Sequence, residues 1–570
     1  MAELEIRDLP QRKKIIPLVM AIANSIITEL RFVEIVNEAA EWERAHWNIS
    51  PGGLAKMLVL STFTDIRIPL THLEERLESI DTGYFLDAED KSSYVNESNV
   101  GEAFDRISET DYDKLYETIA LSAMRQYNMP IMRMHGDTTT VSFYGEYNIE
   151  KLELTDAEKE ALLHIEKGYN KDGRRECKQI VVGQITNEYG VPVVSKALNG
   201  STSDIDWNRE AIRYIGGLAA AGFEKGVFIA DCKLVTEEHI SAMNNPEKRI
   251  SFVSRCPANF EKKLESRTIA KAYGNGKWDE IGPISEAKDS TRYKVASFME
   301  EVCGSSMRLL VLESDTLRKK AEQAIKQKRA GLATAVKNLE RTQWMCLADA
   351  QAERERFLAM KQAALFDCDI TIEKRVAEKW PRGRRRADAV PTVTETFHLH
   401  VQSITNSEQA CREFLQRESC FVLISNVTDG MSDEELVRTY KGQQVVENSF
   451  RMLKGPQLAS VIYLKNPERI KVLNMLLTFS LLLRALIQYR LREGLKAFEE
   501  AHPNEKIPAG WGGRPLKAPT FKLFYEHSVN CCFERESLDR YSFAWPSAET
   551  RARVEPLLKL MGLTLENIMQ

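Results

Sequence analysis

The fold of this chain is indicated first by the stretch Val227-Phe228-Ile229-Ala230-Asp231. Four consecutive apolar residues that end in an acid are typical of a strand buried on both faces, with its last residue emerging at the carboxyl end. Ligands of open α/β sheets bind outside that end of the strands. The stretch therefore predicts an α/β fold in which Asp231 lies at a binding edge.

Outward from this stretch, short strand-like runs alternate with helical ones, which predicts a mixed α/β sheet. The strand-like runs cover residues 131–147, 179–186, 191–198 and 250–254, and the helical runs cover 155–167, 207–221 and 234–244. Residues 256–417 differ in character, with strand-like runs at 292–300, 307–313 and 392–402 and a charge-rich helical run at 314–366. The simplest account is a core fold interrupted by an inserted domain.

A second acid, Asp137, lies in the middle of a β-branched run, His135-Gly136-Asp137-Thr138-Thr139-Thr140. A carboxylate buried in a strand is costly unless a cation or hydrogen-bond donors accompany it. A metal ion would remove that cost.

A third acid, Glu447, lies in a segment with helical character. Offsets of three, four and seven residues reach one face of a helix, so Glu447 is expected to share its face with Tyr440, Gln443, Arg451 and Lys454. Ser432 followed by Glu435 has the pattern of a capping box, although Gly442 could divide the segment into two helices. Such a face suits a phosphate backbone held beside a metal.

Each acid taken alone has an ordinary explanation. Asp231 could cap the following helix, and Glu447 could pair with Arg451 one turn away. Taken together, two acids on strands and one on a helix are the set that holds two divalent ions for phosphodiester chemistry. Carboxylate oxygens favour Mg²⁺ or Mn²⁺, and no set of histidines or cysteines favours zinc.

Composition limits these interpretations only loosely. The chain has 570 residues, 43% of them hydrophobic and 28% charged, and a formal net charge of −5, so any DNA-binding surface must be local. Ten cysteines without CxxC spacing predict reduced thiols and a cytoplasmic location. The apolar run 473–487 is shorter than a bilayer span of about twenty residues, so we expect a buried core helix and no membrane partner.

At the three acids, the chain resembles the insertion-sequence transposases with an Asp-Asp-Glu site, and more narrowly the cut-and-paste group, insertion sequence family four and its relatives. That group has a Tyr-x2-Arg-x3-Glu-x6-Lys signature, which Tyr440, Glu447 and Lys454 match, with Gln443 in the place of arginine. Further matching blocks are His135–Thr140, Gly168–Gln179 and Asp231 with Leu234–Glu238. The resemblance covers roughly residues 130–490.

The resemblance implies a ribonuclease-H-like mixed sheet interrupted by an inserted domain, with a helical N-terminal domain. The acid spacings, 231 − 137 = 94 and 447 − 231 = 216 residues, agree with an insertion before Glu447. The expected domains are a helical N-terminal domain that is a candidate for binding DNA ends (1–125), the first part of the catalytic core (126–255), the inserted domain (256–417), the second part of the core (418–495) and a C-terminal helical extension (496–570).

The resemblance also implies roles for residues. Asp137, Asp231 and Glu447 would be catalytic and would bind two Mg²⁺ or Mn²⁺ ions, while Tyr440, Gln443, Arg451 and Lys454 would contact phosphates. The expected reaction is cleavage at the transposon ends, with a hairpin intermediate, followed by joining to target DNA. The partners would be double-stranded DNA, both terminal inverted repeats and target, and a second copy of the chain in a homodimer.

The basic cluster 379–386 holds Trp380, Arg384 and Arg385, and suits either DNA contact or a solvated loop. Trp344 or Trp380 could stack on a flipped base, as inserted-domain aromatics do in the family, although core packing is favoured for Trp344. His398 and His400 could form a metal pair, but ordinary surface histidines are the favoured interpretation.

Two other functions remain open at the sequence level. Gln443 and Lys233 depart from the family pattern, which suggests a catalytically inactive, transposase-derived DNA-binding protein. A structure-selective nuclease of the same fold is the other alternative.

Overall fold

The computed structural model of the chain describes residues 13–64, 72–86, 91–147, 155–218, 226–247, 249–284, 290–380, 382, 390–455, 464, 466–537 and 540–569. The chain divides into two compact units. Unit 1 contains residues 1–234, 245–251 and 442–570, and unit 2 contains residues 235–244 and 252–441. All three candidate catalytic acids belong to unit 1. The five-part division expected from the sequence stays a prediction.

The centre of unit 1 is a mixed sheet with the strand order β4-β3-β2-β5. Strand β2 (Arg133–Phe143) pairs antiparallel with β3 (Lys178–Asn187), and β3 pairs antiparallel with β4 (Pro192–Leu198). Strand β5 (Val227–Ala230) borders β2 on the other side and runs parallel to it. The strands lie where the apolar and β-branched runs predict them, and the α/β class is confirmed.

One face of this sheet is covered by the long helix α17 (Pro467–Ala501). Directly opposite residues on neighbouring strands point to the same face, and Asp137, Gln184 and Ser195 are opposite one another on β2, β3 and β4. The Asn474 amide of α17 donates a hydrogen bond to the Ser195 hydroxyl over 3.4 Å. The face that bears Asp137 is therefore the face that α17 covers.

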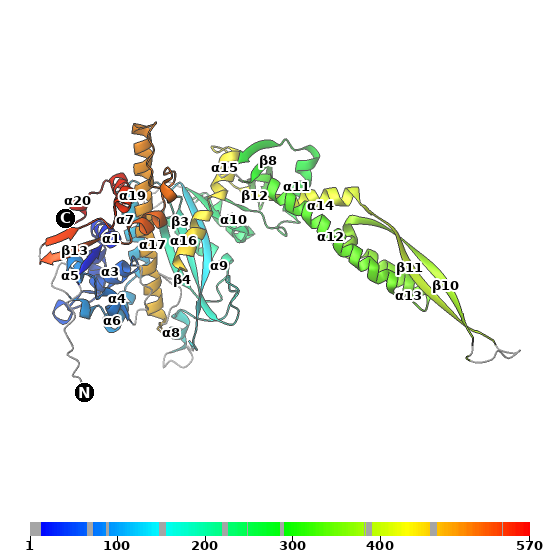
Figure 1. Ribbon diagram of the computed structural model, residues 1–570, viewed down its shortest axis with the longest axis horizontal. Helices are drawn as coiled ribbons and strands as arrows, with labels where there is room; N and C mark the ends of the chain where they lie inside the picture. The colour runs from blue at the N-terminus through cyan, green and yellow to red at the C-terminus, as the bar shows by residue number, and fades with distance from the viewer. Residues whose placement is uncertain are drawn as a thin grey trace. The chain divides into compact units, whose positions relative to one another are not determined.

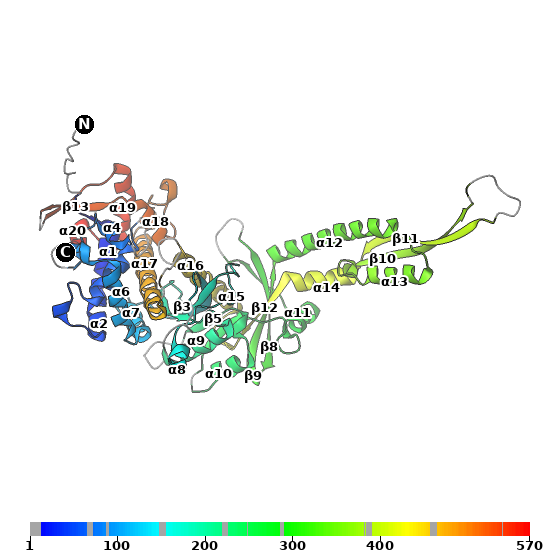
Figure 2. The same ribbon diagram turned by 90° about the horizontal axis from the view of Figure 1, so that it is seen from below.

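The other face is covered by helix α9 (Asp204–Leu218). The Trp207 ring of α9 occupies the space that a side chain at Gly183 of β3 would need, and Gly183 is opposite Thr138. Figures 1 and 2 show α17 and α9 on opposite sides of these strands. Adjacent residues Asp137 and Thr138 thus point to different layers of unit 1.

Helix α17 is the core of unit 1. By length and composition it could cross a membrane, with a mean hydropathy of 1.8 in its most apolar window, but 94% of that window is buried inside the protein. It is surrounded by α1 (Leu18–Glu29), α3 (Pro51–Ser61), α6 (Glu97–Ser108) and α7 (Tyr112–Gln126). Phe479 of α17 stacks on Phe32 of α2 (Phe32–Ala39), with ring centroids 4.2 Å apart. The prediction of a buried core helix is confirmed.

The C-terminal region joins the N-terminal region through a small sheet. Strand β1 (Ile15–Pro17) pairs with β13 (Cys532–Ser537), which pairs with β14 (Arg540–Phe543). Helices α18 (Phe521–Ser528), α19 (Ala548–Leu560) and α20 (Leu565–Ile568) complete the region. The helical extension expected at 496–570 thus contains helices and also two short strands, one of which pairs with β1, more than 500 residues away in the sequence.

Five of the described strands of unit 2 lie in one sheet, in the order β6-β12-β9-β8-β7. They are β6 (Ser251–Arg255), β7 (Asp279–Pro283), β8 (Arg292–Val302), β9 (Ser305–Ser314) and β12 (Cys420–Ser425), and all neighbouring pairs are antiparallel. Helix α11 (Leu264–Asn275) packs against β12. Helices α10 (Glu237–Met243) and α15 (Asp433–Lys441) also belong to this unit.

In the rest of unit 2, the segment 314–366 is not the single helix that the sequence predicts. The segment forms α12 (Asp315–Arg341) and α13 (Leu347–Leu358), and then enters β10 (Phe366–Lys379), which pairs with β11 (Thr392–Asn406). Figure 1 shows β10 and β11 extending beside α13. Apolar residues from all four elements, with Leu365, form one cluster: Leu332, Leu339, Phe357, Leu365, Phe366, Ile370 and Leu399. The break has no Gly or Pro, so the sequence gives no local sign of it.

Candidate functional site: a carboxylate pair on neighbouring strands

Asp137 lies in the middle of β2, and Asp231 directly follows the carboxyl end of the neighbouring parallel strand β5. His135 of β2 is in register with Ile229 of β5, so Asp137 and Asp231 each follow that pair by two residues. A step of two residues returns to the same face, and neighbouring strands are about 4.8 Å apart. We call these two residues the carboxylate pair. Its face is the one covered by α17.

A glycine allows β2 and β5 to pack closely just before the pair. A Cβ atom at Gly136 would lie 2.7 Å from the Phe228 ring of β5, closer than carbon atoms approach each other. The absence of a side chain at Gly136 therefore makes room for Phe228. This contact explains why glycine directly precedes the acid in this strand.

Burial is the main influence on both carboxylates. It raises the pKa of Asp137 to about 6 and also raises the pKa of Asp231. The negative charge of Asp231 raises the pKa of Asp137 further, whereas Lys171 and the Thr138 N–H, which donates to Asp137 Oδ1 over 2.7 Å, oppose the rise. Two acids held close together away from water favour a cation between them.

Lys171 supplies positive charge beside the pair. Its Nζ lies 3.5 Å from Asp137 Oδ1 and 3.1 Å from Asp204 Oδ1, and it donates to the Thr138 carbonyl oxygen over 2.9 Å. The Thr138 hydroxyl donates to Asp204. Burial lowers the pKa of Lys171, but Asp137 and Asp204 outweigh it and the pKa is raised. Lys171 is therefore held as an ammonium among the acids.

The loop that carries Lys171 is fixed to the sheet by polar contacts. The Asn170 amide donates to Ser142 Oγ over 3.1 Å and to Gln179 Oε1 over 2.9 Å, and the Lys171 N–H donates to Thr140 Oγ1 over 3.1 Å. Gln179 is fully buried and donates to the Gly200 carbonyl oxygen. The block at residues 168–179 thus places Lys171 beside β2.

The helix segment of the third acid is divided. Helix α15 ends at Lys441 and α16 (Gln444–Leu453) begins after Gly442, with Gln443 as its N-cap residue. The capping box of Ser432 and Glu435 is confirmed by hydrogen bonds in both directions. The division at Gly442 that the sequence left open is therefore confirmed, so Tyr440 and Glu447 lie on two different helices.

Glu447 lies on an exposed flank of α16. The helix buries Val446, Phe450 and Leu453, and it packs against β2, β3 and α17. At 100° per residue, Glu447 and Lys454 share one flank of this buried stripe. Lys454 Nζ donates to Asp172 Oδ1 and Oδ2 over 2.7 and 2.8 Å. This ion pair links the side of α16 that carries Glu447 to Asp172, which follows Lys171 in the sequence.

The structure brings together two of the three candidate acids. Among the residues that the structure describes, no three histidine, cysteine, aspartate or glutamate side chains form a group that could hold a metal ion. Glu447 is therefore not grouped with the carboxylate pair, and its role as a metal ligand stays a prediction. Arg451 is exposed on α16.

The other candidate DNA contacts lie in unit 2. Trp380 directly follows β10 and is partly exposed, whereas Arg384 and Arg385 lie outside the described residues. Trp344 exchanges backbone hydrogen bonds with Phe397 and packs against the apolar cluster, as core packing predicts. His400 pairs with Glu373 over 2.9 Å, and His398 lies 3.2 Å from Thr396 Oγ1. Neither histidine belongs to a metal-binding group among the described residues.

The carboxylate pair fits a divalent cation in its chemistry. Both donors are carboxylates, which suit Mg²⁺ or Mn²⁺, and their raised pKa values mean that a positive charge would stabilise the ionised forms. Gln184, directly opposite Asp137, is fully buried, and its Oε1 and Nε2 atoms have no hydrogen-bond partner among the described residues. Water bound to an ion beside Asp137 could satisfy this amide.

Three residues of this environment were not identified from the sequence: Lys171, Asp204 and Gln184. Lys171 lies inside the block at 168–179, whose polar residues signal a structured loop but not its contacts. Asp204 precedes a predicted helix and looks like an ordinary first-turn acid. Gln184 is a polar residue within a mostly apolar strand, and this departure from the apolar pattern is the one feature of the sequence that could have identified it.

Comparisons with known proteins add little to this description. Residues 14–121 match a family model described as a domain of unknown function (DUF4277). No curated protein sequence matches the chain. Among solved structures, a piggyBac transposase synaptic complex with hairpin DNA is similar at 8% identity and a TM-score of 0.36, over 90% of this chain and 79% of that one. A likeness this slight leaves the function to be argued from the chain's own residues.

Proposed function

We propose that this protein is a metal-dependent DNA transposase of the cut-and-paste insertion-sequence type. The observation that carries the proposal is the carboxylate pair, an acid within β2 and an acid just after the parallel strand β5, each two residues beyond the registered pair His135 and Ile229 and buried enough to raise both pKa values. Paired carboxylates of this kind hold divalent ions that activate a nucleophile and stabilise a leaving oxygen in phosphodiester cleavage.

The arrangement of the sheet supports a ribonuclease-H-like core. Three strands, β4, β3 and β2, are antiparallel, and β5 is added parallel to β2 after a helical crossover through α9. The first acid comes from β2, which lies between β3 and β5, and the second directly follows β5. All of unit 2 lies between Asp231 and Glu447 in the sequence, as the family's inserted domain would.

Glu447 is the proposed third ligand. Its helix packs against β2, and its flank is tied through Lys454 and Asp172 to the loop beside Asp137. Lys454, Arg451 and Gln443 are proposed to contact DNA phosphates, with Gln443 limited to neutral hydrogen bonds where the family has arginine. Tyr440, with Glu447 and Lys454, supports assignment to the group with the Tyr-Arg-Glu-Lys signature.

The proposal includes the cofactor and partners. Two Mg²⁺ or Mn²⁺ ions would be held by Asp137, Asp231 and Glu447, and when bound they would supply Lewis-acid stabilisation of the reacting phosphate. Trp380, Arg384 and Arg385 are proposed to contact DNA. Two transposon ends must be cut and joined together, so a homodimer on terminal repeats and target DNA is the proposed active form.

The test uses the full chain with a plasmid that carries its coding sequence and the natural flanking DNA. With Mg²⁺ we expect cleavage at two boundaries and joined products in a second plasmid. The same assay with Asp206→Asn is a matched control, because Asp206 is an exposed acid of α9 that pairs with Ser203 and Arg209. Cleavage without joined products would instead identify a nuclease.

A second candidate function is DNA binding without catalysis. The observation that favours it is the Lys171 ammonium, which already supplies a cation within 3.5 Å of Asp137. If Lys171 is a permanent partner, the plasmid assay gives binding at the boundaries but no cleavage with Mg²⁺ or Mn²⁺. The absence of both binding and cleavage would contradict both candidates.

A further inference from the structure

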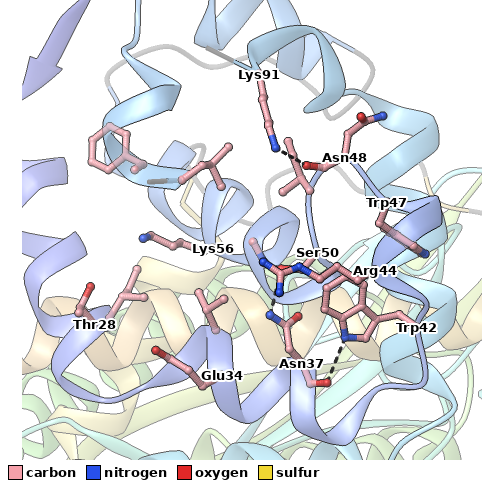
Figure 3. Close-up of a pocket in the computed structure, with 16 residues that line it drawn as sticks. Thr28, Glu34, Asn37, Trp42, Arg44, Trp47, Asn48, Ser50, Lys56 and Lys91 are labelled. Atoms are coloured by element: carbon pink, nitrogen blue, oxygen red, sulfur yellow. Dashed lines mark hydrogen bonds between the residues drawn. The ribbon is translucent and has the colours of Figure 1, made fainter. Parts of the chain in front are cut away.

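The N-terminal helices line an open pocket of about 560 Å³, which we call the tryptophan pocket. Its walls come from α1, α2, α3, from α5 (Thr82–Leu86) and from the segment 42–50, so it lies entirely within the region that matches the domain of unknown function. Volumes of roughly 300–1,000 Å³ are usual for sites that bind small molecules. Figure 3 shows its lining side chains.

Positive charge predominates in the lining. Arg44, Lys56 and Lys91 face a single carboxylate, Glu34, among the lining residues that the structure describes. Lys56 is only 7% exposed, although it lies on a helix that is otherwise apolar. Lys91 donates to the Asn48 carbonyl oxygen over 2.7 Å. Three cations against one carboxylate give this lining a net positive charge, which favours an anionic ligand.

Two partly exposed tryptophans, Trp42 and Trp47, complete the lining. The Trp42 Nε1–H donates to the Asn37 carbonyl oxygen over 3.1 Å, which orients its ring. Neither indole stacks on another aromatic ring in the part of the chain that the structure describes. Indole faces bordering a cationic cavity suit a planar aromatic group joined to an anion.

Hydrogen bonds and close backbone packing hold the wall between α2 and α3 without any ligand. The Asn37 side chain accepts from the Gly52 N–H over 2.8 Å and donates to Ser50 Oγ over 3.0 Å. Ser50 in turn caps α3 by accepting from the Gly53 N–H. A Cβ at Gly52 would lie 2.6 Å from the Val33 carbonyl oxygen, so α2 and α3 are in close contact. The pocket therefore needs little reorganisation to bind.

We propose that the tryptophan pocket binds a nucleotide, with its phosphate beside Arg44, Lys56 and Lys91 and its base against Trp42 or Trp47. The nucleotide is either free or an unpaired residue of a DNA strand, since both present a base joined to a phosphate. The inference depends on the pocket alone and would survive failure of the proposed catalytic activity.

The test measures binding of deoxyadenosine monophosphate and of deoxyribose 5-phosphate to the full chain by calorimetry. Anisotropy of a labelled single-stranded oligonucleotide is measured in parallel. Arg44→Ala removes an exposed cation and is expected to weaken binding of the nucleotide or the oligonucleotide about tenfold, as loss of one charge-assisted hydrogen bond would. Trp47→Phe is expected to weaken nucleotide binding but not sugar phosphate binding, because only the nucleotide has a base to stack.

Controls separate the pocket from general effects. Trp511→Phe and Lys522→Ala change exposed residues of unit 1 outside the pocket and are expected to leave binding unchanged. Because Lys56→Met could fail to fold, it is interpreted only if its thermal unfolding matches that of the native chain. If the variants weaken binding of the monophosphate alone, the pocket is a site for free nucleotides. If they weaken binding of the oligonucleotide alone, the pocket holds a nucleotide within a strand. Equal binding by the native chain, Arg44→Ala and Trp47→Phe would overturn the proposal.

Discussion

The carboxylate pair and the tryptophan pocket are opposite in charge and in construction. The pair places two acids on neighbouring strands, where burial raises their pKa values and Lys171 partly compensates them. The pocket places three cations around a cavity: Lys56 on α3, Arg44 in a single turn of 3₁₀ helix (Arg44–His46) and Lys91 in a loop. The pair is held by sheet register, which fixes backbone positions closely. The pocket depends on caps and loops, so its selectivity is expected to reside in individual side chains.

The largest expected effect is a loss of catalysis in variants of the carboxylate pair, compared with a loss of DNA binding in a variant of the tryptophan pocket. Asp137→Asn or Asp231→Asn is expected to reduce Mg²⁺-dependent cleavage on the order of a thousandfold, because loss of a ligand removes several kcal/mol of charge stabilisation. Arg44→Ala is expected to change DNA affinity and leave the maximal cleavage rate intact. Single-turnover cleavage at saturating protein measures both. A thousandfold loss of the cleavage rate in Arg44→Ala as well would contradict the assignment of catalysis to the carboxylate pair and of binding to the tryptophan pocket.

The second prediction concerns the pH dependence of stability. Asp137 has a pKa near 6 in the folded chain against 3.8 in the unfolded chain. The contribution of its protonated carboxyl group to the free energy of unfolding is therefore fully present below pH 3.8 and is lost as the pH rises through 6. A shift of this size corresponds to about 3 kcal/mol. The free energy of unfolding of Asp137→Asn, minus that of the native chain, is therefore expected to rise between pH 4 and 6 and then level off. Urea unfolding without divalent ions measures this difference. A flat difference would contradict the raised pKa.

Close backbone packing in the two regions can be compared through two glycines. Gly136→Ala meets the Phe228 ring, which can tilt, whereas Gly52→Ala meets the backbone carbonyl of Val33, which cannot move alone. Both changes are expected to lower the free energy of unfolding, by about 1–3 kcal/mol for Gly136→Ala and by more for Gly52→Ala. Phe228→Leu combined with Gly136→Ala should recover part of the loss. The reverse order of the two alanine variants would contradict this account of the packing.

The smallest effect tests whether Lys171 competes with a metal. Lys171→Met removes the ammonium beside Asp137 and is expected to tighten Mn²⁺ binding about tenfold, equivalent to about 1.4 kcal/mol. Calorimetric titration of both chains measures the change. No Mn²⁺ binding by either chain would favour the non-catalytic candidate, in which Lys171 is a permanent partner.

Much of the sheet could be predicted from the sequence, because apolar and β-branched runs depend on local periodicity. The apolar stretch ending at Asp231 and the run around Asp137 both proved to be strands. The split of the helix at 314–366 could not be predicted, since the break at 342–346 has no Gly or Pro and is stabilised by pairing of Trp344 with Phe397. Strand β13 likewise depends on a partner near the N-terminus.

The candidate site was predictable in part for the same reason. Asp137 and Asp231 stand out because an acid at a buried strand is unusual. Lys171 and Asp204 could not be identified, since their contacts arise only when a loop and a helix meet at β2. The tryptophan pocket was not anticipated at all, because its residues have no spacing that distinguishes them from an ordinary helical surface.

The most direct test of the central claim is anomalous diffraction from crystals of the full chain soaked in Mn²⁺. We expect a peak between the carboxylates of Asp137 and Asp231 at about 2 Å from each bound oxygen, with Lys171 displaced from Asp137. Full occupancy of the ion at other sites, with Lys171 still paired to Asp137, would contradict it.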